Sequence, residues 1–79
     1  MGKATRRLVM CLDNTGYEVS LERRKVYVAL LDEFGQRHRY VRVIDESGED
    51  YLYPRKNFVE IELPPAARRA VLQSVGAAN

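Results

Sequence analysis

The 79-residue chain has no tryptophan, one cysteine, one histidine, three prolines and no long hydrophobic run. A single cysteine excludes an intramolecular disulfide, the usual staple of small secreted domains. One histidine with no other histidine or cysteine nearby does not make a zinc site. No segment approaches the roughly 20 apolar residues that cross a bilayer. We therefore expect a small domain without metal or cofactor and without membrane insertion.

The start of the chain has no recognisable targeting signal. Residues 1–6 are polar and basic, and we expect them to form a flexible lead-in. The apolar run 8–12 ends at Asp13 and is too short for a signal peptide. Arg6 stands where the myristoylation pattern requires serine or threonine. These features predict a cytoplasmic protein.

Neither sign of charge dominates the composition. Thirteen basic and eleven acidic residues leave a net charge of +2. This balance is typical of a soluble surface and not of a dedicated nucleic-acid arm. A chain of this length buries only about 60% of the surface that its unfolded form exposes, so one compact core is expected.

Short apolar runs between turn residues predict an all-β domain. Strands are expected at 7–13, 25–32, 39–45, 50–53 and 59–63. A long ordered loop is expected at 14–24, a connector around Gly35, and one helical turn after Pro54. A short helix with an apolar stripe is predicted from Pro65 to Val75, inside a C-terminal segment 64–79.

The sequence around Ser47-Gly48 predicts a tight hairpin. Gly48 can adopt positive φ, which suits a two-residue turn. That turn places Val43 opposite Leu52, and a slip of one residue would exchange the two faces. The expected outward face consists of Tyr40, Arg42, Ile44, Tyr51 and Tyr53.

One face of each strand is expected to supply the core. The predicted core residues are Leu8, Met10, Leu12, Val26, Val28, Leu30, Val41, Val43, Leu52, Phe58, Val59 and Ile61. Cys11 is expected to be a buried thiol that acts as a small hydrophobe, because it lies inside an apolar strand.

Several residues carry a resemblance to a known fold family. Tyr53-Pro54, followed by Asn57-Phe58-Val59, is similar to the run by which Src-homology-3-like domains enter their last strand. Residues 20–30 are similar to that family's entry to the second strand. The chain also resembles small bacterial and phage proteins of this barrel type, through Asn14, residues 21–27 and residues 45–54. The resemblance implies a five-stranded Src-homology-3-like barrel over 7–63.

The resemblance does not extend to the proline-rich peptide binding of the eukaryotic domains. Those domains use a tyrosine-rich motif in the first strand and a tryptophan that begins the third strand. Here the first strand ends Leu12-Asp13-Asn14 and tryptophan is absent. Polyproline docking needs flat aromatic walls, which these differences remove.

Two candidate metal or catalytic features have simpler interpretations. The tip 45–50 gathers four carboxylates, but it lacks calcium-loop spacing and a cleft that could separate their pKa values, so we expect a solvated turn. His38 lies between two arginines and is expected to be a surface loop residue. No nucleophile–base pair or phosphate loop is recognisable, so no catalytic residue is predicted.

The tyrosines of the outward face are the main candidates for function. Tyrosines interleaved with arginine can anchor a protein partner or stack on bases, and they can equally stabilise a sheet through cross-strand pairs. We predict a non-catalytic protein-interaction module, with a nucleic-acid binder as the alternative. The predicted binding residues are Tyr40, Arg42, Tyr51, Tyr53, Tyr17, Arg23 and Arg24.

Overall fold

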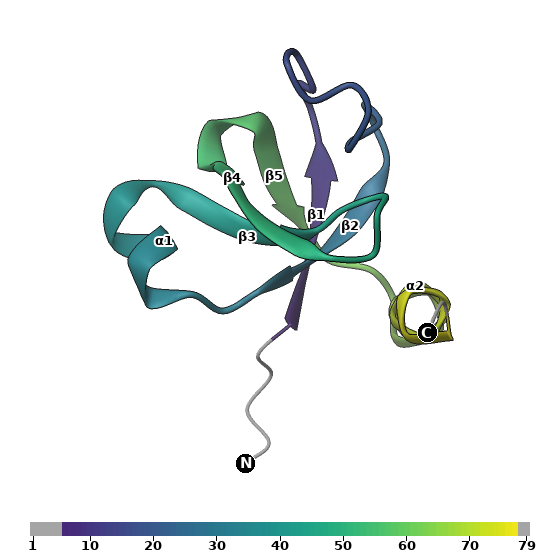
Figure 1. Cartoon of the computed structure of the whole chain (residues 1–79). Coiled ribbons are helices and arrows are strands. Elements are labelled where there is room, and N and C mark those ends of the chain that lie inside the picture. The colour runs from purple at the N-terminus through teal and green to yellow at the C-terminus, as the bar shows by residue number, and fades with distance from the viewer. Residues whose placement is uncertain (1–5, 78–79) are drawn as a thin grey trace.

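The computed structural model describes residues 6–77, so residues 1–5 of the predicted lead-in 1–6 and residues 78–79 lie outside the described part (Figure 1). Arg6, predicted in the flexible lead-in, instead begins the first strand. The strands are β1 (Arg6–Cys11), β2 (Val26–Leu30), β3 (Tyr40–Ile44), β4 (Asp50–Pro54) and β5 (Phe58–Ile61). The helices are α1 (Glu33–His38), the 3-10 helix η1 (Arg55–Asn57) and α2 (Pro65–Ala77). All five predicted strands, the single helical turn and the C-terminal helix are confirmed, the last continuing to Ala77.

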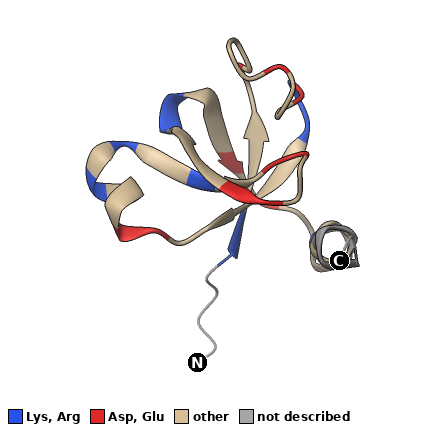
Figure 2. Cartoon of the chain, viewed as in Figure 1, with Lys and Arg blue, Asp and Glu red and all other residues tan. Residues whose placement is uncertain are grey.

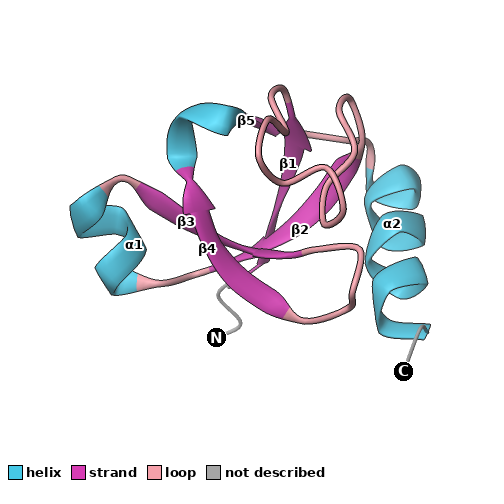
Figure 3. Ribbon diagram, turned by 45° about the horizontal axis from the view of Figure 1, so that its top comes forward, coloured by secondary structure: helices cyan, strands magenta, loops and turns pink. Residues whose placement is uncertain are grey.

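The five strands form one antiparallel sheet in the order β4-β3-β2-β1-β5. The sheet is strongly twisted, and its last strand returns beside its first (Figures 1 and 3). Its two outer strands, β4 and β5, do not pair with each other within residues 6–77. The side of the sheet between these two outer strands is therefore left open. The helix α2 lies against β2 on the outside of the sheet.

The sheet buries apolar side chains on both faces. The main cluster comprises Val9, Cys11, Leu21, Tyr27, Ala29, Val43, Tyr53 and Phe58. Leu8 and Val28 are buried outside this cluster, on the side of the sheet where α2 lies. Burial of the Cys11 thiol, predicted from its apolar strand, is confirmed.

The predicted core covered only one of the two buried faces of the first two strands, where Leu8 and Val28 are buried as predicted. Val9, Tyr27 and Ala29 belong to the main cluster and were not predicted, because a strand with two apolar faces has no alternation to show which face turns inward. Leu12 is 51% exposed and Val59 is 43% exposed, so both were predicted wrongly.

The hairpin between β3 and β4 has a loop of three residues, and the predicted two-residue turn is wrong. The Asp45 carbonyl accepts a hydrogen bond from the Gly48 amide, and the Asp45 amide donates to Glu49. Gly48 has φ +86°, as expected for the residue that closes such a bulged turn. The extra residue shifts the pairing by one, so Tyr51 lies opposite Val43 and Tyr53 lies opposite Val41.

The segment after β2 is a helix, where a loop connector was expected. Asp32 caps α1, because its carboxylate accepts a hydrogen bond of 2.7 Å from the Gly35 amide. Arg39 ends the helix with φ 65°, and its amide donates to the Gly35 carbonyl. Gly35 is buried, and a Cβ atom there would lie 2.7 Å from the Tyr40 carbonyl oxygen. This close approach seats α1 beside the start of β3.

Candidate groove at the open side of the sheet

The predicted outward face of tyrosines and arginine does not exist as one surface. Tyr40 and Arg42 share one face of the sheet, whereas the shifted register turns Tyr51 and Tyr53 to the other. Tyr53 is only 4% exposed and packs in the core. Tyr51 is exposed, and its hydroxyl donates to Glu49. The face was predicted wrongly because its assignment depended on the length of the turn.

Tyr53 and Asp45 form a buried pair at the base of the hairpin. The Tyr53 hydroxyl donates to one carboxylate oxygen of Asp45 at 2.5 Å, and Ser47 donates to the other through its amide and hydroxyl. Burial raises the pKa of Asp45, but these donors outweigh it and the net pKa is lowered. Burial and the hydrogen bond to Asp45 raise the pKa of Tyr53 to about 12.

Asp45 therefore has a structural role, although a solvated acidic tip was expected. It is 6% exposed and its oxygens are satisfied by the turn that it closes. Among the described residues no group of three or more histidine, cysteine or acidic side chains is placed to hold a metal ion. The other three carboxylates of the tip bond to side chains outside the turn.

The loop 14–24 is packed against the sheet by a few anchors. Tyr17 meets Tyr53 edge-to-face with ring centroids 5.0 Å apart, and Leu21 is fully buried. The Tyr27 hydroxyl donates to Glu46 at 2.6 Å and accepts from the Glu22 amide at 2.7 Å. Burial and the bond to Glu46 raise the pKa of Tyr27. The expected long ordered loop is thus present and tied to the hairpin.

The remaining predicted binding residues do not gather at one place. Arg23 and Arg24 are exposed on the loop, and Arg24 has φ 67° with its amide donating to the Cys11 carbonyl. Arg42 donates to Asp32 at 3.2 Å and to Asp50 at 2.9 Å. Those two carboxylates occupy its guanidinium.

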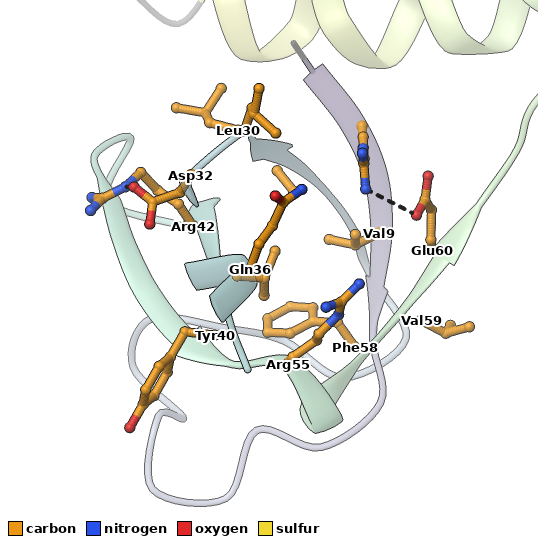
Figure 4. A pocket seen from close by; sticks show the side chains of 14 residues that line it. Val9, Leu30, Asp32, Gln36, Tyr40, Arg42, Arg55, Phe58, Val59 and Glu60 are labelled. Atoms are coloured by element: carbon orange, nitrogen blue, oxygen red, sulfur yellow. Dashed lines mark hydrogen bonds and ion pairs between the residues drawn. The ribbon is translucent and has the colours of Figure 1, made fainter. Parts of the chain in front are cut away.

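A hollow of about 280 Å³ lies at the open side of the sheet, between α1, β3 and the β1–β5 pair (Figure 4). We call it the groove. Its apolar floor consists of Val9, Ala29, Val41 and Phe58. Its polar border includes Arg7, Asp32, Gln36, Arg55 and Glu60.

The side chains around the groove are oriented unevenly. Gln36 from α1 and Arg55 from η1 extend over the hollow, and the Phe58 ring lies beneath Arg55 (Figure 4). Tyr40 and Val59 point away from it (Figure 4). Of the predicted binding residues, only Tyr40 and Arg42 border the groove, and they do so from β3.

The groove has more cationic than anionic groups available to a ligand. Arg7 and Glu60 form a loose ion pair at 3.6 Å, with both side chains about half exposed. The Asp32 carboxylate accepts hydrogen bonds from the Gly35 amide and from Arg42. Both bonds lower the pKa of Asp32, and the bond from Gly35 has the larger effect. Arg55 takes part in none of the ion pairs formed within the described residues.

Further cations continue the basic border beyond the groove. The Arg55 amide donates to the Arg39 carbonyl at 3.0 Å, so the end of α1 and the start of η1 lie side by side. Lys and Arg mark both segments in Figure 2, while the tip of the β3–β4 hairpin is acidic. His38 is exposed, as expected for a surface residue, and stacks on Phe34 with centroids 4.2 Å apart.

Apart from Tyr40 and Arg42, the groove residues were not predicted as binding residues from the sequence. Arg55 and Gln36 come from two short helices, one expected only as a turn and the other as a loop. Asp32 three residues before Gly35 is an N-cap pattern that could have indicated α1. The convergence of α1 and η1 depends on the strand register, which had no local signal of its own.

Comparison of the chain with family models, with curated proteins and with solved structures finds no match. No helix within residues 6–77 is long and apolar enough to cross a membrane. The groove and its chemistry are therefore the available guide to function.

Proposed function

We propose that this chain is a non-catalytic protein-interaction module that receives a segment of its partner in the groove. The observation that carries the proposal is an apolar floor of four side chains at the open side of an otherwise packed sheet. Hydrophobic hollows bordered by a few polar groups are the usual docking points for a ligand. The floor is formed by rigid strands, which suits recognition without rearrangement.

The size of the groove favours a side chain over a cofactor. Its volume of about 280 Å³ falls below the roughly 300–1,000 Å³ of pockets that enclose drug-sized molecules. One large apolar side chain of a partner would fill such a space, with the rest of the segment lying along the border. Buried anchors of this kind carry most of the energy in protein interfaces.

A non-catalytic role fits the way the polar side chains are used. Tyr27 and Glu46 join the hairpin to the loop 14–24, and Asp45 holds the hairpin turn through Ser47 and Tyr53. Within the described residues no buried side-chain nitrogen or oxygen lacks a hydrogen-bond partner. This use of polar side chains in structural hydrogen bonds supports a binding role.

The proposal includes the Src-homology-3-like fold as an open variant of that barrel. Its support is the strand order, in which β5 returns beside β1, and the single 3-10 turn between β4 and β5. The nucleic-acid alternative, which rested on basic loops and surface tyrosines, has lost part of its support, because Tyr53 is buried and Tyr51 lies apart from Arg42. Phe34 and Tyr40 remain exposed, so the oligonucleotide competition described below tests this alternative directly.

Gln36→Trp tests the proposal, because it adds a bulky ring over the hollow without altering the floor. Peptides selected from a displayed random library against the wild type should bind the variant about tenfold or more weakly by fluorescence anisotropy. Val19→Trp is the matched control, since Val19 is 95% exposed on the loop and does not line the groove.

Melting curves establish that both variants remain folded. Selected peptides that bind Gln36→Trp as tightly as wild type would rule out the groove as the docking site. Loss of binding only in Val19→Trp would move the site to the loop 14–24.

A further inference from the structure

We propose that the segment received by the groove is acidic, with one apolar anchor side chain next to a carboxylate that pairs with Arg55. This inference rests on the proposed function, because it names the chemistry of the partner at the same site. It commits to a peptide segment of a protein as the occupant.

The first argument is the one cation at the border of the groove that has no ion-pair partner. Arg7, Arg42 and Arg55 supply three positive charges, and Asp32, Glu60 and the Arg42 partner Asp50 supply three negative charges. Arg7 is paired with Glu60, Arg42 is paired with two carboxylates, and Asp32 also caps α1. The free cation is thus Arg55, which has no ion pair in the described part of the chain.

The second argument is the position of Arg55 relative to the apolar floor. Its guanidinium extends over the hollow while the Phe58 ring lies beneath it (Figure 4). An anchor side chain seated on the floor would therefore place its neighbouring residues beside Arg55. Arginine suits this role, because its planar fork can bind both oxygens of a carboxylate.

The third argument is the distribution of charge around the groove. Arg37, Arg39 and Lys56 continue the basic border along the end of α1 and along η1 (Figure 2). A segment with several acidic residues would be steered toward this end of the molecule, and the acidic hairpin tip would repel it from the other. A basic segment would instead be repelled from the basic border and attracted to the acidic hairpin tip.

Three synthetic peptides test the inference against four proteins and the Gln36→Trp variant introduced above. The peptides carry a fluorescein label and a glycine–serine background: one has a leucine flanked by glutamates, one has glutamines in place of the glutamates, and one has serine in place of the leucine. The proteins are wild type, Arg55→Ala, Arg55→Lys and Arg23→Ala, an exposed cation outside the groove.

We expect the acidic leucine peptide to bind wild type about tenfold more tightly than either of the other peptides. Arg55→Ala should abolish the preference for glutamate over glutamine while retaining the preference for leucine. Arg55→Lys should restore part of it, and Arg23→Ala should leave it unchanged. The preference should also weaken as the salt concentration rises.

Two results would overturn the inference in distinguishable ways. Equal binding of the glutamate and glutamine peptides, with Gln36→Trp abolishing both, would leave the groove as the docking site and remove the acidic partner. Tighter binding of a twelve-residue oligothymidylate, in competition with the acidic peptide, would assign the basic border to nucleic acid. Absence of binding by every peptide would contradict the proposed function as well.

Discussion

Tyr53 decides how the hairpin contributes to the molecule. Its ring packs against Tyr17 and Phe58, with centroid distances of 5.0 and 6.2 Å, and its hydroxyl reaches Asp45. One side chain thereby joins the loop 14–24, the last strand and the turn between β3 and β4. The tyrosine that was predicted to bind a partner instead holds the core together.

Removing the Tyr53 hydroxyl leaves a buried carboxylate one donor short. We expect Tyr53→Phe to lower the free energy of unfolding by about 1–3 kcal/mol, measured by urea denaturation. Tyr51→Phe is the matched control, because that hydroxyl bonds to Glu49 at the exposed surface, and it should change little. Equal effects of the two substitutions would contradict the structural role of the pair.

The lowered pKa of Asp45 predicts the direction of a pH effect. A carboxyl whose folded pKa lies below its unfolded value near 3.8 contributes stability above that pH, and the contribution disappears as pH falls through the folded pKa. The stability difference between wild type and Asp45→Asn should stay constant from about pH 7 to 5 and narrow below about pH 4. Urea denaturation across this pH range measures the stability difference. A difference that persists undiminished to pH 2 would contradict the lowered pKa of Asp45.

The hairpin shows at residue scale where sequence reasoning reached its limit. Gly48 correctly indicated a turn with positive φ, and Val43 was correctly placed inside. Both a two-residue and a three-residue loop are compatible with one glycine at this position. Asp45 selects the longer loop by accepting bonds from Ser47, and this choice exchanges the faces of β4.

At the scale of single elements, α1 is the part of the fold that most directly shapes the groove. It is only six residues long, so its position depends on its contacts and not on helix propensity. Asp32 caps its start and Arg42 holds Asp32 from β3. The close approach of Gly35 to the Tyr40 carbonyl then fixes the distance between helix and strand.

Gly35→Ala should push α1 away from β3, because the new methyl group would lie 2.7 Å from a backbone oxygen. We expect a loss of about 2 kcal/mol in unfolding free energy, with a fall of roughly 8–16 °C in Tm. Gln36→Ala is the control in the same helix and should melt near wild type. An unaltered melting temperature for Gly35→Ala would show that the helix is free to move.

The burial of Leu21 and the helix α1 were missed from the sequence for a shared physical reason. The loop 14–24 has no apolar period, yet Leu21 is fully buried because single anchors can fix a loop without a repeating pattern. The helix α1 is shorter than the window in which a 3.6-residue period can be recognised. The strands and α2 were predictable because their patterns are local, whereas the groove arises where separate elements converge.

At the scale of the whole molecule, the sheet has two apolar faces, and the twist of the sheet encloses only one of them. The other side includes Leu8 and Val28, each 1% exposed, and α2 lies against β2 there. Among residues 65–73 of this helix, the partly buried positions are Arg68, Val71 and Leu72. The C-terminal helix is therefore an integral part of the packing.

Val71→Asp should weaken the docking of α2, because it would place a charge on the partly buried side of the helix. We expect a loss of about 1–2 kcal/mol in unfolding free energy and increased binding of the dye ANS. Gln73→Asp adds the same charge at an exposed position of α2 and serves as the control. Identical melting curves for the two variants would exclude a stabilising role for this helix.

Binding in the groove is tested most directly by a 1H–15N NMR titration with the acidic leucine peptide. We predict that the largest shift changes will fall on the amides of Val9, Ala29, Gln36, Arg55 and Phe58, and that they will saturate together. Shift changes confined to the loop 14–24 and the hairpin tip, with the groove amides unchanged, would contradict binding in the groove.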